Sequence, residues 1–135
     1  MNKVAERFWE RAKEAALAAK HVLPVSANAA ASRAYYSAFY AVSALFALEG
    51  KTFKKHSAIE RAVHRDLVRP GLWPKKLGGD YSVLVELRDT SDYGVLKSVS
   101  PDEAASAIQL SENILRAVAE AHPQEFTGLA EIQPT

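Results

Sequence analysis

The 135-residue sequence contains no cysteine, which excludes disulfide bridges and zinc sites built from thiolates. Long apolar runs are absent too, because the longest one, from Ala38 to Leu48, is well short of the roughly 18 residues of a membrane span. The first residues lead straight into an amphipathic pattern without the apolar core of a secretion signal. We therefore expect a cytoplasmic protein that is not embedded in a membrane.

Local motifs for several kinds of chemistry are also missing. The histidines have neither the His-x-x-x-His spacing nor the Glu-x-x-His spacing of helical metal sites; they are His21, His56, His64 and His122. The Gly78-Gly79 pair lacks the flanking strand and the Lys-Ser step of a phosphate-binding loop. No local signature of Ser-His-Asp catalysis is present. We expect neither a metal site nor a cofactor.

What the sequence does contain is helical periodicity. Apolar residues recur every three or four positions in five segments, at about 2–23, 27–49, 55–68, 81–93 and 101–121. The fourth segment could start as early as Lys75, and residues 72–80 are otherwise expected to form a loop or a ragged helix start. No segment shows sustained alternation of apolar and polar residues, so no sheet is expected.

These segments predict one all-α domain, an antiparallel bundle of about five helices over residues 1–122, followed by a flexible tail at 123–135. The second segment is apolar nearly all round, which is typical of a helix that packs on several partners. The fifth segment has the clearest start, because Ser100-Pro101-Asp102-Glu103 has the pattern of a capping box.

Positive charge is concentrated in the middle of a chain whose net charge is only +1. Within residues 51–76, Glu60 and Asp66 are the only acids among many basic residues: Lys51, Lys54, Lys55, Arg61, Arg65, Arg69, Lys75 and Lys76. Arg61 and Arg65 are four residues apart and should share one helix face. Two interpretations stay open, a solvated helix face or a surface that attracts phosphates of RNA or acids of a partner.

A polar cluster closes the otherwise apolar fourth segment. Arg88 follows Leu84 by four residues and therefore lies on the inward or partner-facing stripe, where a lone charge is costly to bury. Asp92, four residues further on, could form a simple ion pair with Arg88 worth about 0.3–0.5 kcal/mol. Tyr93 is five residues from Arg88, so we expect the two to meet only if the helix unwinds at Gly94 or a second subunit contributes.

Three ordered motifs resemble the HEPN domain family: Tyr35-Tyr36-Ser37-Ala38-Phe39 in the second segment, His56-Ser57 at the start of the third, and Arg88-x-x-x-Asp92-Tyr93 at the end of the fourth. They extend over about residues 29–94. The resemblance implies a helical bundle that forms a homodimer, with the functional residues in a cleft at the two-fold interface. Active members cleave RNA without metal through an Arg-x(4–6)-His motif. Many are toxins paired with a small nucleotidyltransferase that attaches AMP to a tyrosine near the motif.

Carried over to this sequence, the resemblance assigns Arg88 to the motif arginine and Asp92 to the polar residue inside the motif. Tyr93 takes the place of the histidine and is also a candidate AMP acceptor. The exchange matters because histidine titrates near pH 6.5 and tyrosine near about 10, so neutral tyrosine is a poor base at pH 7. Arginine still suits a phosphate, because its planar fork carries several N–H donors.

Further candidates for phosphate or nucleic-acid binding are Arg33, His56, Arg61 and Arg65. For His56 a ring exposed at a helix start is the simpler interpretation, as an exposed helix-start arginine is for Arg33. We interpret Tyr35, Tyr36 and Tyr40 as packing residues more readily than as base-stacking platforms.

Three functions remain open at this stage. The chain could be a metal-independent ribonuclease and toxin subunit. It could instead be a module that binds a nucleotide or a partner without catalysis, which the Tyr93 exchange favours. The third possibility is a helical interaction protein in which Arg88 and Asp92 pair across a dimer.

Overall fold

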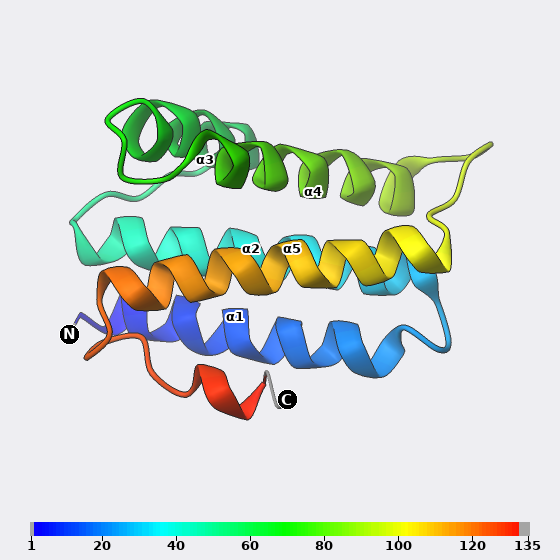
Figure 1. Ribbon diagram of the computed structural model, residues 1–135, viewed down its shortest axis with the longest axis horizontal. Coiled ribbons are helices and arrows are strands. Elements are labelled where there is room, and N and C mark those ends of the chain that lie inside the picture. Colours follow the sequence, from blue (N-terminus) through cyan, green and yellow to red (C-terminus); the bar gives the residue numbers. More distant parts are fainter. Residues whose placement is uncertain (1, 133–135) are drawn as a thin grey trace.

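The computed structural model describes residues 2–132, and every regular element in that range is helical. Five α-helices are present within it, α1 (Lys3–Val22), α2 (Ala27–Leu48), α3 (His56–Ala62), α4 (Lys75–Tyr93) and α5 (Pro101–Ala121). A π-helical segment, η1 (Val63–Val68), continues α3, and a short 3₁₀ turn, η2 (Leu129–Glu131), follows α5. The helices pack into a bundle, which confirms the predicted all-α fold (Figure 1).

Side chains that the sequence places just outside the helices cap their first turns. The Asn2 side chain accepts from the Ala5 amide at 2.7 Å and thereby starts α1. Ser26 does the same for α2. At α5 the Ser100 hydroxyl accepts from the Glu103 amide, while the Glu103 carboxylate accepts from the Ser100 amide, so the predicted capping box is formed.

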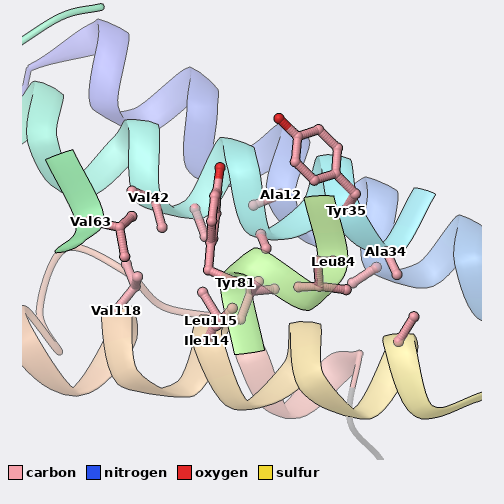
Figure 2. Close-up of a cluster of buried hydrophobic side chains, with 14 of the residues drawn as sticks. Ala12, Ala34, Tyr35, Val42, Val63, Tyr81, Leu84, Ile114, Leu115 and Val118 are labelled. Atoms are coloured by element: carbon pink, nitrogen blue, oxygen red, sulfur yellow. The ribbon is translucent and has the colours of Figure 1, made fainter. Parts of the chain in front are cut away.

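Helix α2 is the centre of the bundle, as its apolar character predicted. Its alanines lie against the alanines of α1, and these small side chains let the two backbones approach closely. The buried Ser37 hydroxyl donates to the Ala12 carbonyl across this contact at 2.7 Å. On another side, Leu84 of α4 joins Ile114, Leu115 and Val118 of α5 in the core (Figure 2).

The helices around α2 leave one of its sides partly uncovered, where the start of α3 contacts it through His56. Helices α1, α4 and α5 each pack against α2, and α5 also contacts both α1 and α4. Helices α1 and α4 make almost no contact with each other, since α2 and α5 lie between them (Figure 1). The side of α2 that faces away from α5, between α1 and α4, is called the open side below.

The connection between α3 and α4 differs from the prediction in two ways. The third segment ends its α-helical geometry at Ala62 and continues as η1, a form of helix that often marks a functional or strained site. Residues 75–80, which we left between a loop and an early helix start, belong to α4. Gly78 explains this, because a Cβ there would lie only 2.6 Å from Val68 Cγ2, so its lack of a side chain lets α4 pack closely on η1.

The expectation of a loose tail is wrong for residues 123–132. Phe126 is 2% exposed and its ring lies 5.1 Å from that of Trp9, whose indole Nε1 donates to the Thr127 carbonyl at 2.8 Å. Lys20 also donates to the Ile132 carbonyl. Isolated apolar residues between polar ones have no periodicity, so the sequence pattern did not predict this packing on α1 (Figure 1). The remainder of the predicted tail, residues 133–135, lies outside the described residues.

Candidate functional site

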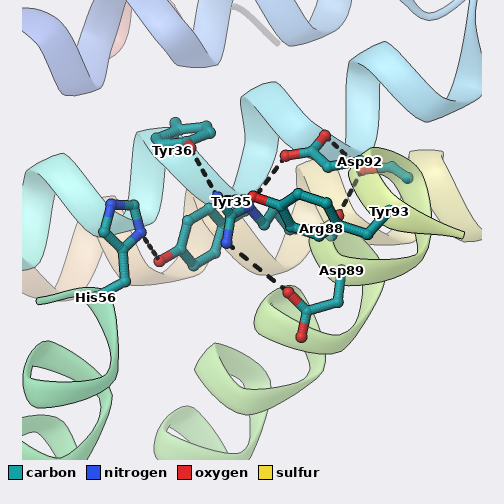
Figure 3. A network of polar contacts seen from close by, with 8 residues as sticks. Tyr35, Tyr36, His56, Arg88, Asp89, Asp92 and Tyr93 are labelled. Atoms are coloured by element: carbon teal, nitrogen blue, oxygen red, sulfur yellow. Dashed lines mark hydrogen bonds and ion pairs between the residues drawn. The ribbon is translucent and has the colours of Figure 1, made fainter.

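Arg88 is the centre of a hydrogen-bonded cluster between α4 and α2. It lies one turn after the buried Leu84, on the inward side of α4 as predicted, and its side chain is 16% exposed. Its Nε donates to Asp92 Oδ2 at 3.0 Å, and its Nη2 donates to the hydroxyls of Tyr36 at 3.0 Å and Tyr93 at 3.1 Å. Figure 3 shows these contacts converging on the guanidinium. Two helices therefore hold the charged group in place.

Aromatic rings surround the same guanidinium. Its Cζ lies 5.4 Å from the ring centre of Tyr35, 5.5 Å from that of Tyr36 and 5.1 Å from that of Tyr93. The negative faces of aromatic rings attract cations, and such contacts are worth about 0.5–2 kcal/mol depending on how dry they are. The cluster thus replaces the water that Arg88 loses by being partly buried. A charged side chain on the inward side of a helix needs such partners, because burying it alone is costly.

Tyr93 reaches Arg88 at the end of helix α4, where Gly94 leaves the helical conformation. The contact forms within one chain, so it needs no second subunit. Both side chains are long, so they bridge the offset between positions five apart at the last turn of the helix. Tyr93 remains 66% exposed, and its hydroxyl is accessible to other molecules.

Two carboxylates balance the charge of Arg88. Asp92 forms the predicted i,i+4 pair within one chain, so this contact needs no second subunit. Asp89 is largely exposed, and its Oδ1 lies 3.7 Å from Nη1, which is an ion pair but too long for a hydrogen bond. Burial by itself would lower the pKa of Arg88, but the Tyr36 hydroxyl, Tyr93 and Asp92 outweigh it, so the pKa lies above its usual value. The guanidinium is permanently charged.

His56 joins the cluster through Tyr35, and its ring is not exposed as the simpler interpretation held. It is half-buried, stacks on Phe39 at 4.2 Å, and forms a 2.8 Å hydrogen bond through Nδ1 with the Tyr35 hydroxyl. Burial, and secondarily the positive charge of Arg88, lowers the pKa of His56 below 6.5, so the imidazole is neutral at pH 7. Burial also raises the pKa of Tyr35 to about 12. His56 therefore fixes the ring against which Arg88 packs.

Of the other predicted arginines, the structure brings only Arg33 to this cluster. Its Cζ lies 4.8 Å from the ring centre of Tyr36, the same ring that Arg88 contacts. Arg61 is exposed and makes no contact with the cluster, and Arg65 is exposed and paired with Asp66 at 2.8 Å. The basic stretch of residues 51–76 therefore does not contribute these two arginines to the site around Arg88.

Tyr36 and Asp89 take part in polar contacts that the sequence pattern did not predict. We treated Tyr36 as packing, whereas its hydroxyl accepts from Arg88 across 52 positions of sequence. Its neighbour Tyr35 does belong to the core. Adjacent residues of a helix point about 100° apart, so Tyr35 and Tyr36 meet different neighbours although both belong to the same apolar helix.

Neither a metal-binding cluster nor a membrane-spanning helix is found among the described residues. Within residues 2–132, no group of three His, Asp or Glu side chains is placed so that it could hold a metal ion. None of the helices in the same range has both the length and the apolar character needed to cross a bilayer.

Comparison with known proteins gives the family. The HEPN domain model matches residues 5–121. A protein of Thermotoga maritima named UPF0332 protein is 36% identical over 117 residues, which cover 86% of this chain and 89% of the relative. Both alignments extend well beyond residues 29–94, which contain the three motifs that resemble the family. The chain belongs to the HEPN domain family.

Proposed function

We propose that this protein is a metal-independent ribonuclease of the HEPN type, acting as a homodimer and as the toxin subunit beside a nucleotidyltransferase. One observation carries the proposal: Arg88 is held by hydrogen bonds from Nε and Nη2, while its Nη1 makes no hydrogen bond within residues 2–132. Nη1 meets only the exposed Asp89, at 3.7 Å, so its N–H groups make no hydrogen bond among residues 2–132. A phosphate oxygen can take the place of Asp89 there.

The two phenols add further donors on one side of the guanidinium. Tyr36 and Tyr93 both accept a hydrogen bond from Nη2, so each keeps its own O–H to donate. An anion beside Arg88 would therefore meet charge-assisted N–H groups together with phenolic O–H groups. Preorganised donors of this kind stabilise the charge that develops on a phosphate during its transfer.

The chemistry that suits these groups is attack by the RNA 2′-hydroxyl on the adjacent phosphorus. This reaction needs no protein nucleophile, and it leaves a cyclic phosphate and a free 5′-hydroxyl. Arg88 would bind the phosphate, and Asp92 would hold the guanidinium through Nε. As the 2′-oxygen bonds to phosphorus, its proton would pass to solvent water; as the bond to the 5′-oxygen breaks, Tyr93 would donate its proton to that oxygen and regain one from solvent. A neutral phenol suits the role of acid better than that of base at pH 7.

Cleavage by the purified protein in EDTA tests the proposal. We expect Arg88→Ala to lower the cleavage rate by at least about 100-fold, as loss of a preorganised donor at a phosphate does. Arg65→Ala is the matched control, because that exposed arginine pairs with Asp66 and does not contact the cluster. An Arg88→Ala variant that cuts RNA as fast as its parent would eliminate the site.

The toxin pairing has its own test. Mass measurement after incubation with the cognate nucleotidyltransferase and ATP should find one added AMP, and Tyr93→Phe should prevent the addition. The exposure of Tyr93 supports this assignment, since an enzyme must reach its hydroxyl. AMP found on another tyrosine, or on none, would contradict it.

A second function, binding of a nucleotide or partner without catalysis, is favoured by a specific feature. Two carboxylates already balance the Arg88 charge, and tyrosine stands where cleaving relatives have histidine. This function predicts RNA or nucleotide binding that depends on Arg88, with no turnover under any condition. If an Arg88→Met variant loses stability but keeps its binding, the cluster is only structural.

A further inference from the structure

The open side of α2 carries a strip of half-buried aromatic rings with arginines lying over them. Tyr40 stacks on Phe8 of α1 at 6.2 Å and lies 6.0 Å from Tyr36. Arg11 Cζ lies 5.7 Å from the Tyr40 ring centre, as Arg33 Cζ lies 4.8 Å from that of Tyr36. Phe8 of α1 and, at 5.8 Å from Tyr36, His56 of α3 border the strip, but Tyr36 and Tyr40 stay only half-buried because α1 and α4 remain apart on this side.

Grooves extend along this strip to the Arg88 cluster. One groove, of about 710 Å³, runs between α1 and α2 and is lined by Arg11, Arg33 and Tyr40 among others. A second, of about 430 Å³, is lined by Arg33 and by Asp92 of the cluster. Arg33 borders both, so the two form one path that ends beside the residues that hold Arg88.

The arginines of this path have unused hydrogen-bonding capacity. No carboxylate within residues 2–132 pairs with Arg7, Arg11 or Arg33. A cation above a ring uses the face of the guanidinium, so its N–H edges stay available. The first groove also contains glutamates, but Glu10 is paired with Lys13 at 3.0 Å. Lys3 and these three arginines then outweigh Glu6 and Glu14, and the path is locally positive.

We propose that this path binds single-stranded RNA and leads the strand to Arg88. The N–H edges of Arg33 and Arg11 hold phosphates, and bases stack on the outer planes of these guanidinium groups, which Tyr36 and Tyr40 support from below. The inference rests on the proposed function, which it extends by naming the strand-binding surface. Proteins that bind single strands combine cations along the backbone with aromatic platforms, because every base has a face that can stack. A path that ends at the phosphate-binding group fits a strand better than a mononucleotide.

Binding of a fluorescent 12-nucleotide oligouridine RNA, measured by anisotropy in EDTA at several salt concentrations, tests the inference. We expect Arg33→Met, which keeps an unbranched stem but removes the donors, to weaken binding at least about fivefold and to reduce the salt slope by about 0.7. Tyr40→Leu should weaken binding with little change of slope. Arg65→Met is the control and should bind as the parent does, because Arg65 is already paired with Asp66.

The outcomes separate this inference from the proposed cleavage. If the parent never cuts RNA but binds the strand, and Arg33→Met weakens that binding, the RNA-binding path is supported and the proposed cleavage is contradicted. If Arg33→Met and Tyr40→Leu both bind RNA as well as the parent, the path is overturned whatever the cleavage rate. It is also overturned if duplex RNA binds more tightly than the single strand.

A second copy of the chain could instead cover the open side. Sedimentation of the same variants distinguishes this case. If Arg33→Met and Tyr40→Leu disrupt a dimer while RNA binding per chain is unchanged, the surface is a subunit interface and the RNA path is wrong. If the oligomeric state is unchanged while RNA binding falls, the path is supported.

Discussion

Tyr35 and Tyr36 are neighbours on α2, yet the two sides of the helix give them different chemistry. Tyr35 is 1% exposed, its hydroxyl is tied to His56, and burial raises its pKa to about 12. Tyr36 faces the open side, where its hydroxyl accepts from Arg88 and its ring lies near two guanidinium groups. The neighbouring helices, and not the residue type, decide whether a tyrosine supports the core or remains available to a ligand.

The largest expected effect separates these two tyrosines. Tyr35→Ala should lower the free energy of unfolding by about 3–5 kcal/mol, because it leaves a large cavity in the core. Tyr36→Ala should cost about 1 kcal/mol, since the ring is only half-buried, but it should weaken RNA binding. Urea unfolding followed by circular dichroism measures both. Equal losses of stability would show that the open side is packed as tightly as the core.

The next prediction concerns residues 123–132, which pack on α1 beside Trp9. Phe126→Ala should lower the free energy of unfolding by about 3 kcal/mol, because the ring is buried against Trp9. Gln124→Ala, at an exposed position two residues earlier, should change it by less than about 0.5 kcal/mol. A Phe126→Ala protein as stable as its parent would mean that this segment does not belong to the core.

Gly78 and Gly79 of α4 are also adjacent residues in different surroundings, one packed against η1 and one facing open space. Gly78→Ala should destabilise the protein by about 1–3 kcal/mol, because the new Cβ meets the stiff Val68 side chain at 2.6 Å. Gly79→Ala should stabilise it by about 0.5–1 kcal/mol, since no atom lies within 4 Å and alanine favours the helix. Thermal melting of the two variants beside the parent tests this, and shifts of the same sign would contradict it.

The smallest effect is a dependence of stability on pH through His56. Its pKa is lower in the folded chain than in the unfolded one, so the unfolded state binds the proton more readily. The contribution is therefore complete above about pH 6.5 and is lost as the pH falls through the lower folded value. Tyr35 and Tyr36 from α2 and Arg88 from α4 surround the ring, and the Arg88 charge strengthens the effect.

Urea unfolding midpoints at pH 7.5 and 5.5 measure the contribution of His56 to stability when the parent is compared with His56→Gln. The parent should lose more stability between the two pH values than the variant, which has no imidazole at this position. Equal losses would place the titration elsewhere in the molecule.

The sequence predicted the features that depend on local spacing. Five helical segments follow from apolar periodicity, and the start of α5 follows from the Ser100–Glu103 capping box. The inward position of Arg88 and its pairing with Asp92 follow from steps of four residues along one helix. These features could be predicted because neighbours on a helix surface are three or four positions apart.

The features that the sequence did not predict are contacts between distant segments. Gly78 packs closely against η1, and Phe126 is buried against Trp9. His56 is half-buried because the Phe39 ring and the Tyr35 hydroxyl receive it. No periodicity within any of these short segments encodes its partner.

By itself, then, the sequence determined the helices and the family resemblance, and that resemblance grouped Arg88, Asp92 and Tyr93. Only the tertiary structure decided that Tyr36 and Arg33 join the cluster around Arg88, and that Arg61 and Arg65 do not contact it. The physical reason is that hydrogen bonds and ring contacts act over a few ångströms in space. Packing around α2 brings positions 36 and 88 within that range, although 52 positions of chain separate them.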